Sequence, residues 1–204
     1  MIGPMTYTEG REQRAPRVRT RDPQRRDSIL RAAVPLLARS GFTAVSMADI
    51  GTEVGIAASA IYWHFASKQA LLAAVFDECL ERLLQAQDEA VRHSNGSEDA
   101  LRRLVDQHVD FVVTERALAR VYYRESVHLP LEDQDRLRRK QAGMVALWTD
   151  MLCSARPGLD RDRSRPLVDA AIGAVQSTLR ARAVLPEDEL RHMLAAAAWW
   201  VLFG

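Results

Sequence analysis

The sequence predicts an all-α fold of nine helices. After residue 22, apolar residues recur at the three- and four-residue spacing of a buried helix face, and no segment keeps the alternation of a half-buried strand. Serine, glycine and proline stand where these stretches begin or end, as they do at helix termini. With 204 residues, 48% of them hydrophobic, the chain is long enough for one substantial core or for a small module attached to a larger one.

An arm and three helices are predicted at the N-terminal end. Residues 1–22 carry scattered arginine, glycine and proline without apolar periodicity, which predicts a flexible Arg-rich arm. Pro35 lies inside the first helix and predicts a kink or a loosened turn there, because proline removes a backbone donor. The three predicted helices are Asp22–Ser40, ended by Gly41, then Met47–Val54 and Ala58–Phe65.

A long helix and five more complete the predicted fold. The long helix follows a capping serine, Ser67, and has an apolar stripe from Leu71 to Leu84 at i, i+3, i+4 spacing. Proline and acidic residues open two of the later helices, as the first turn of a helix favours. The six helices are predicted over Lys68–Arg92, from Ser97 onward, and over Arg116–Ser126, Pro130–Ala155, Ser164–Arg182 and Pro186–Phe203.

Two short helices within Ser46–Phe65 are spaced as in a helix-turn-helix. Gly55 lies between them and can take the positive φ that a sharp turn requires. Gly51 is small enough to let the helices approach closely, and Ile56 would fill the angle between them. This arrangement predicts a second helix that projects into the major groove of duplex DNA. A helical hairpin inside a larger core is the alternative. It explains less well why Tyr62, Trp63 and His64 stand so close to Lys68 in the sequence.

Several side chains around the second short helix have donors suited to DNA. Ser59 and the free N–H groups at the helix start can meet a phosphate or a base edge. Tyr62 and His64 carry polar tips, Lys68 adds a positive charge, and Ser46 offers a hydroxyl at the preceding helix cap. These residues are the candidate phosphate contacts.

Charge distribution and cysteine content bear on the binding partner and the cellular location of the protein. The net charge is +1, but residues 1–68 hold ten basic against six acidic side chains and the remainder eighteen against twenty-one. That asymmetry suits a DNA-binding head on a separate body, and equally a solvated basic tail. Two cysteines, the absence of a signal peptide and a longest apolar run of only Met193–Phe203 predict a cytoplasmic protein without membrane contact.

The N-terminal part resembles tetracycline-repressor-like (TetR-type) transcriptional regulators. The Tyr-x-His-Phe-x-Ser-Lys run from Tyr62 to Lys68 is its most specific feature, and the resemblance covers about a quarter of the chain. It implies nine helices, a helix-turn-helix domain over 23–67 and an effector-binding and dimerisation domain over 68–204. The matching stretches are Arg26–Ala33, Gly41–Ser46, Gly55–Ile56 and Ile61–Leu72.

The resemblance also assigns roles to individual positions. It implies phosphate contacts from Ser46, Tyr62, His64 and Lys68, and it places Ala57, Ala58, Ser59 and Trp63 toward the groove. This chain departs from the family pattern at three positions: Ala57 replaces a capping Ser or Thr, Ala58 lacks polar reach, and Gly51 replaces the commoner Ala. Direct hydrogen-bond readout of bases is therefore expected to be sparse, with thymine methyl contact by Ala58 and packing by Trp63 as alternatives.

The C-terminal part contains a candidate interface and a candidate cavity. The last helix is apolar on every side and the one before it is rich in small residues, so a four-helix homodimer interface is expected; an intramolecular core is the alternative. The interface candidates are Ala170, Ala174, Trp199, Trp200 and Phe203. Aromatic and polar residues within the earlier stripes predict a cavity for a mostly apolar ligand, lined by His108, Phe111, Tyr122, Tyr123, Gln141, Met144 and Trp148.

The functional hypothesis is a ligand-responsive homodimeric regulator. We expect a repressor that binds a palindromic operator and responds to a mostly apolar small molecule, with acyl-CoA or a lipid-like compound as candidates. A redox sensor using Cys79 or Cys153, a ligand-independent DNA-binding protein and a nonspecific architectural binder are the alternatives. No metal-ligand spacing, phosphate loop or nucleophile elbow occurs, so neither an enzyme nor a cofactor is expected.

Overall fold

The computed structural model describes residues 23–180 and 185–204, and the expected arm over 1–22 lies outside them. The described residues form nine α-helices, two short 3-10 turns and no strand, which confirms the all-α class. The elements are α1 (Pro23–Ala44), α2 (Met47–Glu53), α3 (Ala58–Tyr62), α4 (Lys68–Arg92), α5 (Ser97–Thr114), α6 (Arg116–Glu125), η1 (Ser126–His128), α7 (Leu131–Ala155), α8 (Arg161–Gln176), η2 (Ser177–Arg180) and α9 (Glu187–Phe203).

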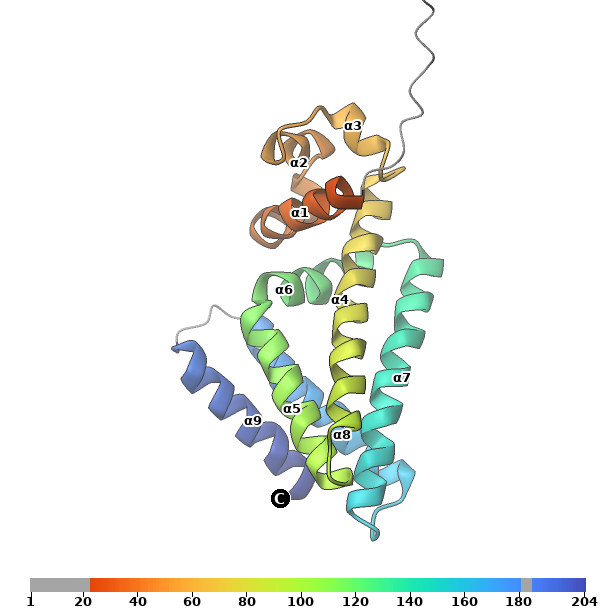
Figure 1. The fold of residues 1–204 in the computed structure, drawn as a ribbon, viewed down its shortest axis with the longest axis vertical. Helices are drawn as coiled ribbons and strands as arrows, with labels where there is room; N and C mark the ends of the chain where they lie inside the picture. Colours follow the sequence, from red (N-terminus) through yellow and green to blue (C-terminus); the bar gives the residue numbers. More distant parts are fainter. Residues whose placement is uncertain (1–22, 181–184) are drawn as a thin grey trace, which may run out of the picture.

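Helix α4 is the long axis of the molecule. At one end it meets the group formed by α1, α2 and α3, and it then runs down beside α7 (Figure 1). Helix α6 lies crosswise below α1, and α5, α8 and α9 complete the opposite end. Among the described residues no helix is both long and apolar enough to cross a membrane.

Two clusters of buried apolar side chains hold the fold together. The first joins α1, α2 and α3 to α6 and to the first half of α4, including Leu71 and Phe76. The second joins α5, α7, α8 and α9 to the remaining part of α4, through Leu83 and Ala90. Helix α4 therefore belongs to both clusters, and so does α6, which gives Val121 to the first and Ala119 to the second.

Several predicted boundaries differ from the observed ones. Helix α1 leaves helical geometry at Gly41 (φ 80°), as expected of a glycine stop, and its only non-helical backbone angles are there rather than at Pro35. Helix α3 ends at Tyr62 instead of Phe65. Pro130 and Pro186 are the capping residues before α7 and α9, in extended geometry, rather than their first helical residues.

Helix α8 shows the largest boundary error. It begins at Arg161, three residues before the predicted start, because the Asp160 side chain caps it by accepting a hydrogen bond from the Arg163 N–H at 2.9 Å. The predicted helix Ser164–Arg182 also ends early, since the α-helix changes to the tighter turn η2 after Gln176.

Candidate functional site

The turn between α2 and α3 depends on two glycines. Gly55 has φ 68°, the left-handed conformation that glycine adopts without steric cost. Gly51 is buried, and a Cβ atom added to it would lie 2.6 Å from the carbonyl oxygen of Ile56. The Ile56 N–H donates to the Gly51 carbonyl at 2.8 Å, so the backbones are already in contact there.

We expect Gly51→Ala to destabilise the protein. The added methyl group would meet backbone rather than a mobile side chain, and overpacking of this kind costs about 1–3 kcal/mol in the free energy of unfolding. Gly143→Ala is the matched control, because Gly143 is in the middle of α7 with nothing within 4 Å of an added Cβ. That variant should gain stability, by roughly 0.5–1 kcal/mol. Chemical denaturation measures both, and a stabilised Gly51→Ala protein would contradict the expectation.

Helix α2 begins with a complete capping box. The Ser46 hydroxyl accepts from the Asp49 N–H at 3.1 Å, and the Asp49 carboxylate accepts from the Ser46 N–H at 2.8 Å and from the Ser46 hydroxyl at 2.7 Å. The Ser46 backbone bond, followed by its hydroxyl bond, lowers the pKa of Asp49 below its usual value. Because the hydroxyl proton is used by Asp49, Ser46 can donate to a phosphate only after releasing that carboxylate.

Helix α3 presents an exposed and largely apolar surface. Tyr62 and Trp63 are 52% and 59% exposed. Ser59 is exposed and Ala58 half-buried, and Ala57 precedes the helix as its cap residue without a side-chain hydrogen bond. The missing serine or threonine cap noted in the sequence therefore leaves the first N–H groups of α3 without a side-chain acceptor from Ala57.

Lys68 and His64 are less accessible than Tyr62. The Lys68 ammonium donates to the carbonyls of Phe42 at 2.6 Å and Val45 at 2.7 Å, and it lies 4.2 Å from the centre of the Phe42 ring. It joins the start of α4 to the chain after Gly41, and it retains one further donor for a phosphate. His64 is half-buried against Phe65.

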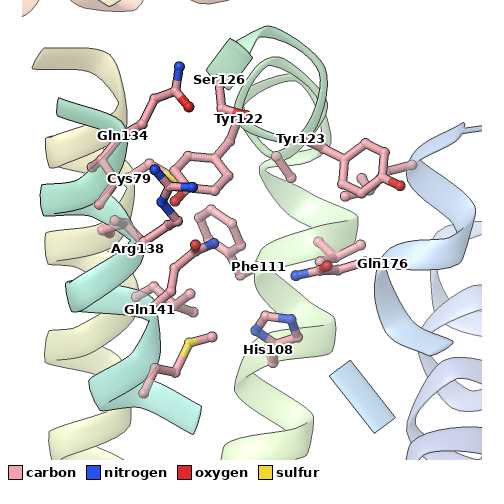
Figure 2. A pocket seen from close by; sticks show the side chains of 17 residues that line it. Cys79, His108, Phe111, Tyr122, Tyr123, Ser126, Gln134, Arg138, Gln141 and Gln176 are labelled. Carbon is pink, nitrogen blue, oxygen red and sulfur yellow. The ribbon is translucent and has the colours of Figure 1, made fainter. Parts of the chain in front are cut away.

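A cavity of about 380 Å³ lies where the two apolar clusters meet. Its lining includes Leu80 of the first cluster and Leu83 of the second. Figure 2 shows the side chains that surround it. Six of the seven residues proposed from the sequence line this cavity: His108, Phe111, Tyr122, Tyr123, Gln141 and Met144. Trp148 does not; it is fully buried and packs edge-on against His108, with ring centroids 5.9 Å apart.

Sequence reasoning missed several polar lining residues. Gln134 and Arg138 precede Gln141 by seven and three residues and so share its face of α7, and extending that register would have found them. Gln176 comes from the end of α8 and reaches the cavity only through the tertiary packing, which no local pattern signals. Cys79 and Ser126 are the other polar lining residues that were not proposed.

Burial changes the ionisation of three residues around the cavity. Desolvation lowers the pKa of His108 to about 4 and raises the pKa of the Cys79 thiol to about 12. It also raises the pKa of Tyr122 well above its usual value. These side chains are therefore neutral near pH 7, and a neutral thiol is a poor nucleophile and a poor redox sensor. The described residues contain no cluster of three potential metal-ligating side chains.

The end of α6 is hydrogen-bonded to the end of α1. The buried Glu125 carboxylate accepts from the Phe42 N–H at 3.1 Å and lies 3.4 Å from the His128 ring nitrogen Nε2. The His128 ring in turn stacks on the Phe42 ring, with centroids 4.9 Å apart. Because Tyr122 and Tyr123 on α6 line the cavity, this helix connects the cavity wall directly to the helix that precedes α2.

Helices α8 and α9 each expose small or apolar residues. Trp200 is 73% exposed, and Met193, Ala196 and Ala197 lie on the same exposed face of α9. On α8 the exposed small residues are Ala170 and Gly173, with Ala174 half-buried. Trp199 and Phe203 instead stack on each other at 4.3 Å, and Arg102 and Arg156 cover their rings. The five interface residues proposed from the sequence therefore do not form one group: Trp199 and Phe203 lie on a different face of α9 from Trp200, and Ala170 and Ala174 lie on α8.

The comparisons with known proteins agree with this architecture. Residues 29–75 match the family described as Bacterial regulatory proteins, tetR family, and residues 94–180 match the Tetracyclin repressor-like, C-terminal domain. The Fatty acid metabolism regulator protein of Bacillus subtilis (strain 168) is 21% identical over 156 residues, which cover 74% of this chain and 80% of that protein. The HTH-type transcriptional repressor KstR2 of Mycolicibacterium smegmatis is 25% identical over 155 residues, covering 72% and 76%.

Solved structures show the same fold. A TetR-family transcriptional regulator from Bordetella parapertussis 12822 superposes with a TM-score of 0.80 at 22% identity, over 90% of this chain and 96% of that one. The matched families and relatives are transcriptional regulators rather than enzymes. With both the helix-turn-helix segment and the C-terminal domain matched, this chain belongs to the TetR family of bacterial transcriptional regulators.

Proposed function

We propose that this protein is a homodimeric repressor whose affinity for a palindromic operator is controlled by a mostly apolar small molecule. The observation that carries the proposal is the cavity between the two apolar clusters, because α4 and α6 line it and both also pack against the α1–α3 group. A ligand that changes the tilt of either helix would change the spacing of the two α3 helices in a dimer. DNA favours a spacing of about one helical turn, roughly 34–36 Å.

The DNA-binding surface in this proposal is centred on α3 and the cap of α2. Tyr62, His64, Lys68 and Ser46 contact phosphates, and Trp63 with Ala57, Ala58 and Ser59 faces the groove. The exposure of Tyr62 and Trp63, which are adjacent at the end of α3, supports this assignment, since neighbouring exposed aromatic side chains can form a contact patch. The engaged hydroxyl of Ser46 and ammonium of Lys68 make these two residues organisers of the surface as well as phosphate ligands.

Apolar and aromatic walls support an apolar effector. The cavity has one charged lining residue, Arg138, among the described residues. The names of two similar proteins refer to fatty acid metabolism and to transcriptional repression, which accords with a lipid-like effector and a repressor. A long acyl chain could occupy the cavity, and a polar carrier such as CoA would then extend past Arg138. The raised pKa of the Cys79 thiol argues against Cys79 as the redox sensor, and leaves Cys153 as the candidate for that alternative.

Two experiments test the proposal. The full-length protein is used to select duplexes from a random pool, and the selected sites are footprinted; a short palindromic footprint is expected, whereas uniform protection would favour an architectural DNA binder. Thermal denaturation is then followed with a panel of lipids and acyl-CoAs. A ligand that raises the melting temperature should change the affinity for the selected duplex. If stabilising ligands leave that affinity unaltered, the regulatory role of the cavity is refuted.

Substitutions on α3 should separate base readout from phosphate contact. We expect Trp63→Ala to weaken binding to the selected duplex by about 1–3 kcal/mol and to relax base preference beneath α3, with no change in the salt dependence. Tyr62→Phe removes only a hydroxyl and should weaken selected and random duplexes alike. Leu131→Ala is the control, because Leu131 is 74% exposed at the start of α7 and takes no part in the α3 surface. Fluorescence anisotropy titrations measure these effects; a Trp63→Ala protein with unchanged specificity would remove Trp63 from the readout.

A further inference from the structure

His108 is the most deeply buried polar group in the cavity wall. It lies on α5 with 2% of its surface exposed, and neither ring nitrogen has a hydrogen-bond partner among the described residues. Its ring touches the edge of Trp148 on one side. On the cavity side, Gln141 from α7 and Gln176 from α8 line the same space, and Figure 2 shows all three polar side chains around one part of the pocket.

An imidazole held in this way needs a partner. Burial keeps it neutral, so one nitrogen is a donor and the other an acceptor. A buried donor or acceptor without a partner is destabilising, and native proteins seldom leave both nitrogens of one ring in that state. A ligand carrying an oxygen at this position would supply the missing hydrogen bond, while a pure hydrocarbon would not.

The charges around the cavity restrict which oxygen this can be. Arg138 is the one charged side chain among the described lining residues; it is 62% exposed and pairs with Asp135 on its own helix. Arg138 is therefore a largely exposed and already paired cation, not a buried counter-charge for an anion beside His108. An ionised carboxylate placed there would lose its hydration without gaining a permanent counter-charge, which is costly in an apolar site.

We infer that His108 recognises an uncharged oxygen function, a hydroxyl or a carbonyl, on an otherwise apolar effector, and that it discriminates against an ionised carboxylate. This inference rests on the proposed effector role of the cavity and adds the ligand chemistry to it. Gln141 and Gln176 can share the same oxygen or hold a second one, because each amide offers a donor and an acceptor. A thioester or ketone carbonyl and an alcohol fit this description, whereas a free fatty acid that puts its carboxylate beside His108 does not.

Four matched probes test the ligand chemistry: butylbenzene, phenylbutanol, benzylacetone and phenylbutanoate. They share an aromatic body and differ in bearing no oxygen, a hydroxyl, a ketone or a carboxylate. Calorimetric titration of the full-length protein near pH 7.5 should show the alcohol and the ketone binding about tenfold more tightly than butylbenzene. The carboxylate should bind more weakly than both. Equal affinity for phenylbutanoate and benzylacetone would overturn the inference.

Variants of His108 provide the second readout. His108→Phe should abolish the advantage of the oxygenated probes, keep the affinity for butylbenzene, and raise the melting temperature of the ligand-free protein, because a buried unpaired group is removed. His108→Gln, which keeps a donor and an acceptor, should restore part of the advantage. His192→Phe, at an exposed position on α9 outside this cavity, is the control. An unchanged oxygen advantage in His108→Phe would overturn the inference.

Direct observation of the His108 ring completes the test without any substitution. Nitrogen NMR of histidine-labelled protein should show a neutral ring whose resonances shift when benzylacetone is added, and a protonated ring in the complex would count against the inference. Failure of all four probes, butylbenzene included, to bind has a different meaning. It would refute the cavity as an apolar effector site, and with it the proposed function.

Discussion

Trp200→Glu should reduce the affinity for the selected operator by a hundredfold or more. Trp200 is 73% exposed in a stripe of apolar residues on α9, and the neighbouring helix α8 exposes small residues as well. A tryptophan at the centre of a symmetric interface contributes heavily to binding, and a buried carboxylate would face its own copy across the two-fold axis. Separated protomers bind one half-site each and lose an avidity of about 10²–10⁴.

The measurement combines sedimentation equilibrium with DNA titration. Wild-type protein should be dimeric at micromolar concentration and Trp200→Glu monomeric, with its helical content unchanged by circular dichroism. Leu131→Glu is the matched control, since Leu131 is equally exposed but lies at the start of α7, remote from α8 and α9 (Figure 1). A Trp200→Glu protein that remains dimeric and binds the operator normally would move the interface to another surface, such as the Trp199 and Phe203 face.

Local chemistry made the fold predictable from the sequence. The long helix α4 was predicted with both of its observed ends, because Ser67 caps its start and the polar run His93-Ser94-Asn95-Gly96 ends it. The turn between α2 and α3 was predicted from Gly55 and Gly51, whose observed φ value and backbone contact are the properties that the turn requires. The start of α8 was missed because its capping residue, Asp160, lies in a stretch with little apolar periodicity.

The sites depend more on tertiary packing and were only partly predictable. Six proposed residues meet in one cavity because aromatic and polar members of an apolar stripe already face inward on their helices. Trp148 packs on His108, and Gln176 lines the cavity, because of the way in which α5, α7 and α8 cross. The apolar stripe of a single helix does not encode that crossing. In the same way, periodicity could not show which of Trp199 and Trp200 packs within the subunit and which is exposed, because α9 is apolar on every side.

Glu125 was not proposed from the sequence either, although its position connects the cavity to the DNA-binding helices. An acidic residue near the end of a helix looks like a solvated surface group, and only the fold buries it beside Phe42. Gly41 makes this approach possible because its φ of 80° turns the chain toward Glu125. A Cβ added to Gly41 would lie in ordinary contact with Glu125 Oε1, at 3.6 Å, so the backbone angle rather than the space favours glycine. A change in the tilt of α6 therefore reaches the Phe42 N–H through a single hydrogen bond.

Glu125→Ala should weaken both the fold and the response to ligand. The substitution leaves the buried Phe42 N–H without its acceptor, which costs about 1–3 kcal/mol in the free energy of unfolding. It also removes the hydrogen bond between α6 and α1, and leaves only the apolar packing of Leu118 and Val121 to connect the two helices. Effectors of two-site proteins commonly change affinity at the other site by roughly 5–150-fold; in Glu125→Ala that ratio should fall toward one, while the ligand still binds the cavity with nearly unchanged affinity.

Glu125→Gln separates the hydrogen bond from the charge. Its amide oxygen still accepts from the Phe42 N–H, so it should keep most of the coupling and most of the stability, although the ion pair with Arg124 is lost. Operator affinity is measured with and without a saturating stabilising ligand, at a temperature where every variant is folded. If Glu125→Ala keeps the full wild-type ratio, the coupling runs through α4 or through the apolar packing of α6 on α1. The hydrogen bond between α6 and α1 then only stabilises the fold.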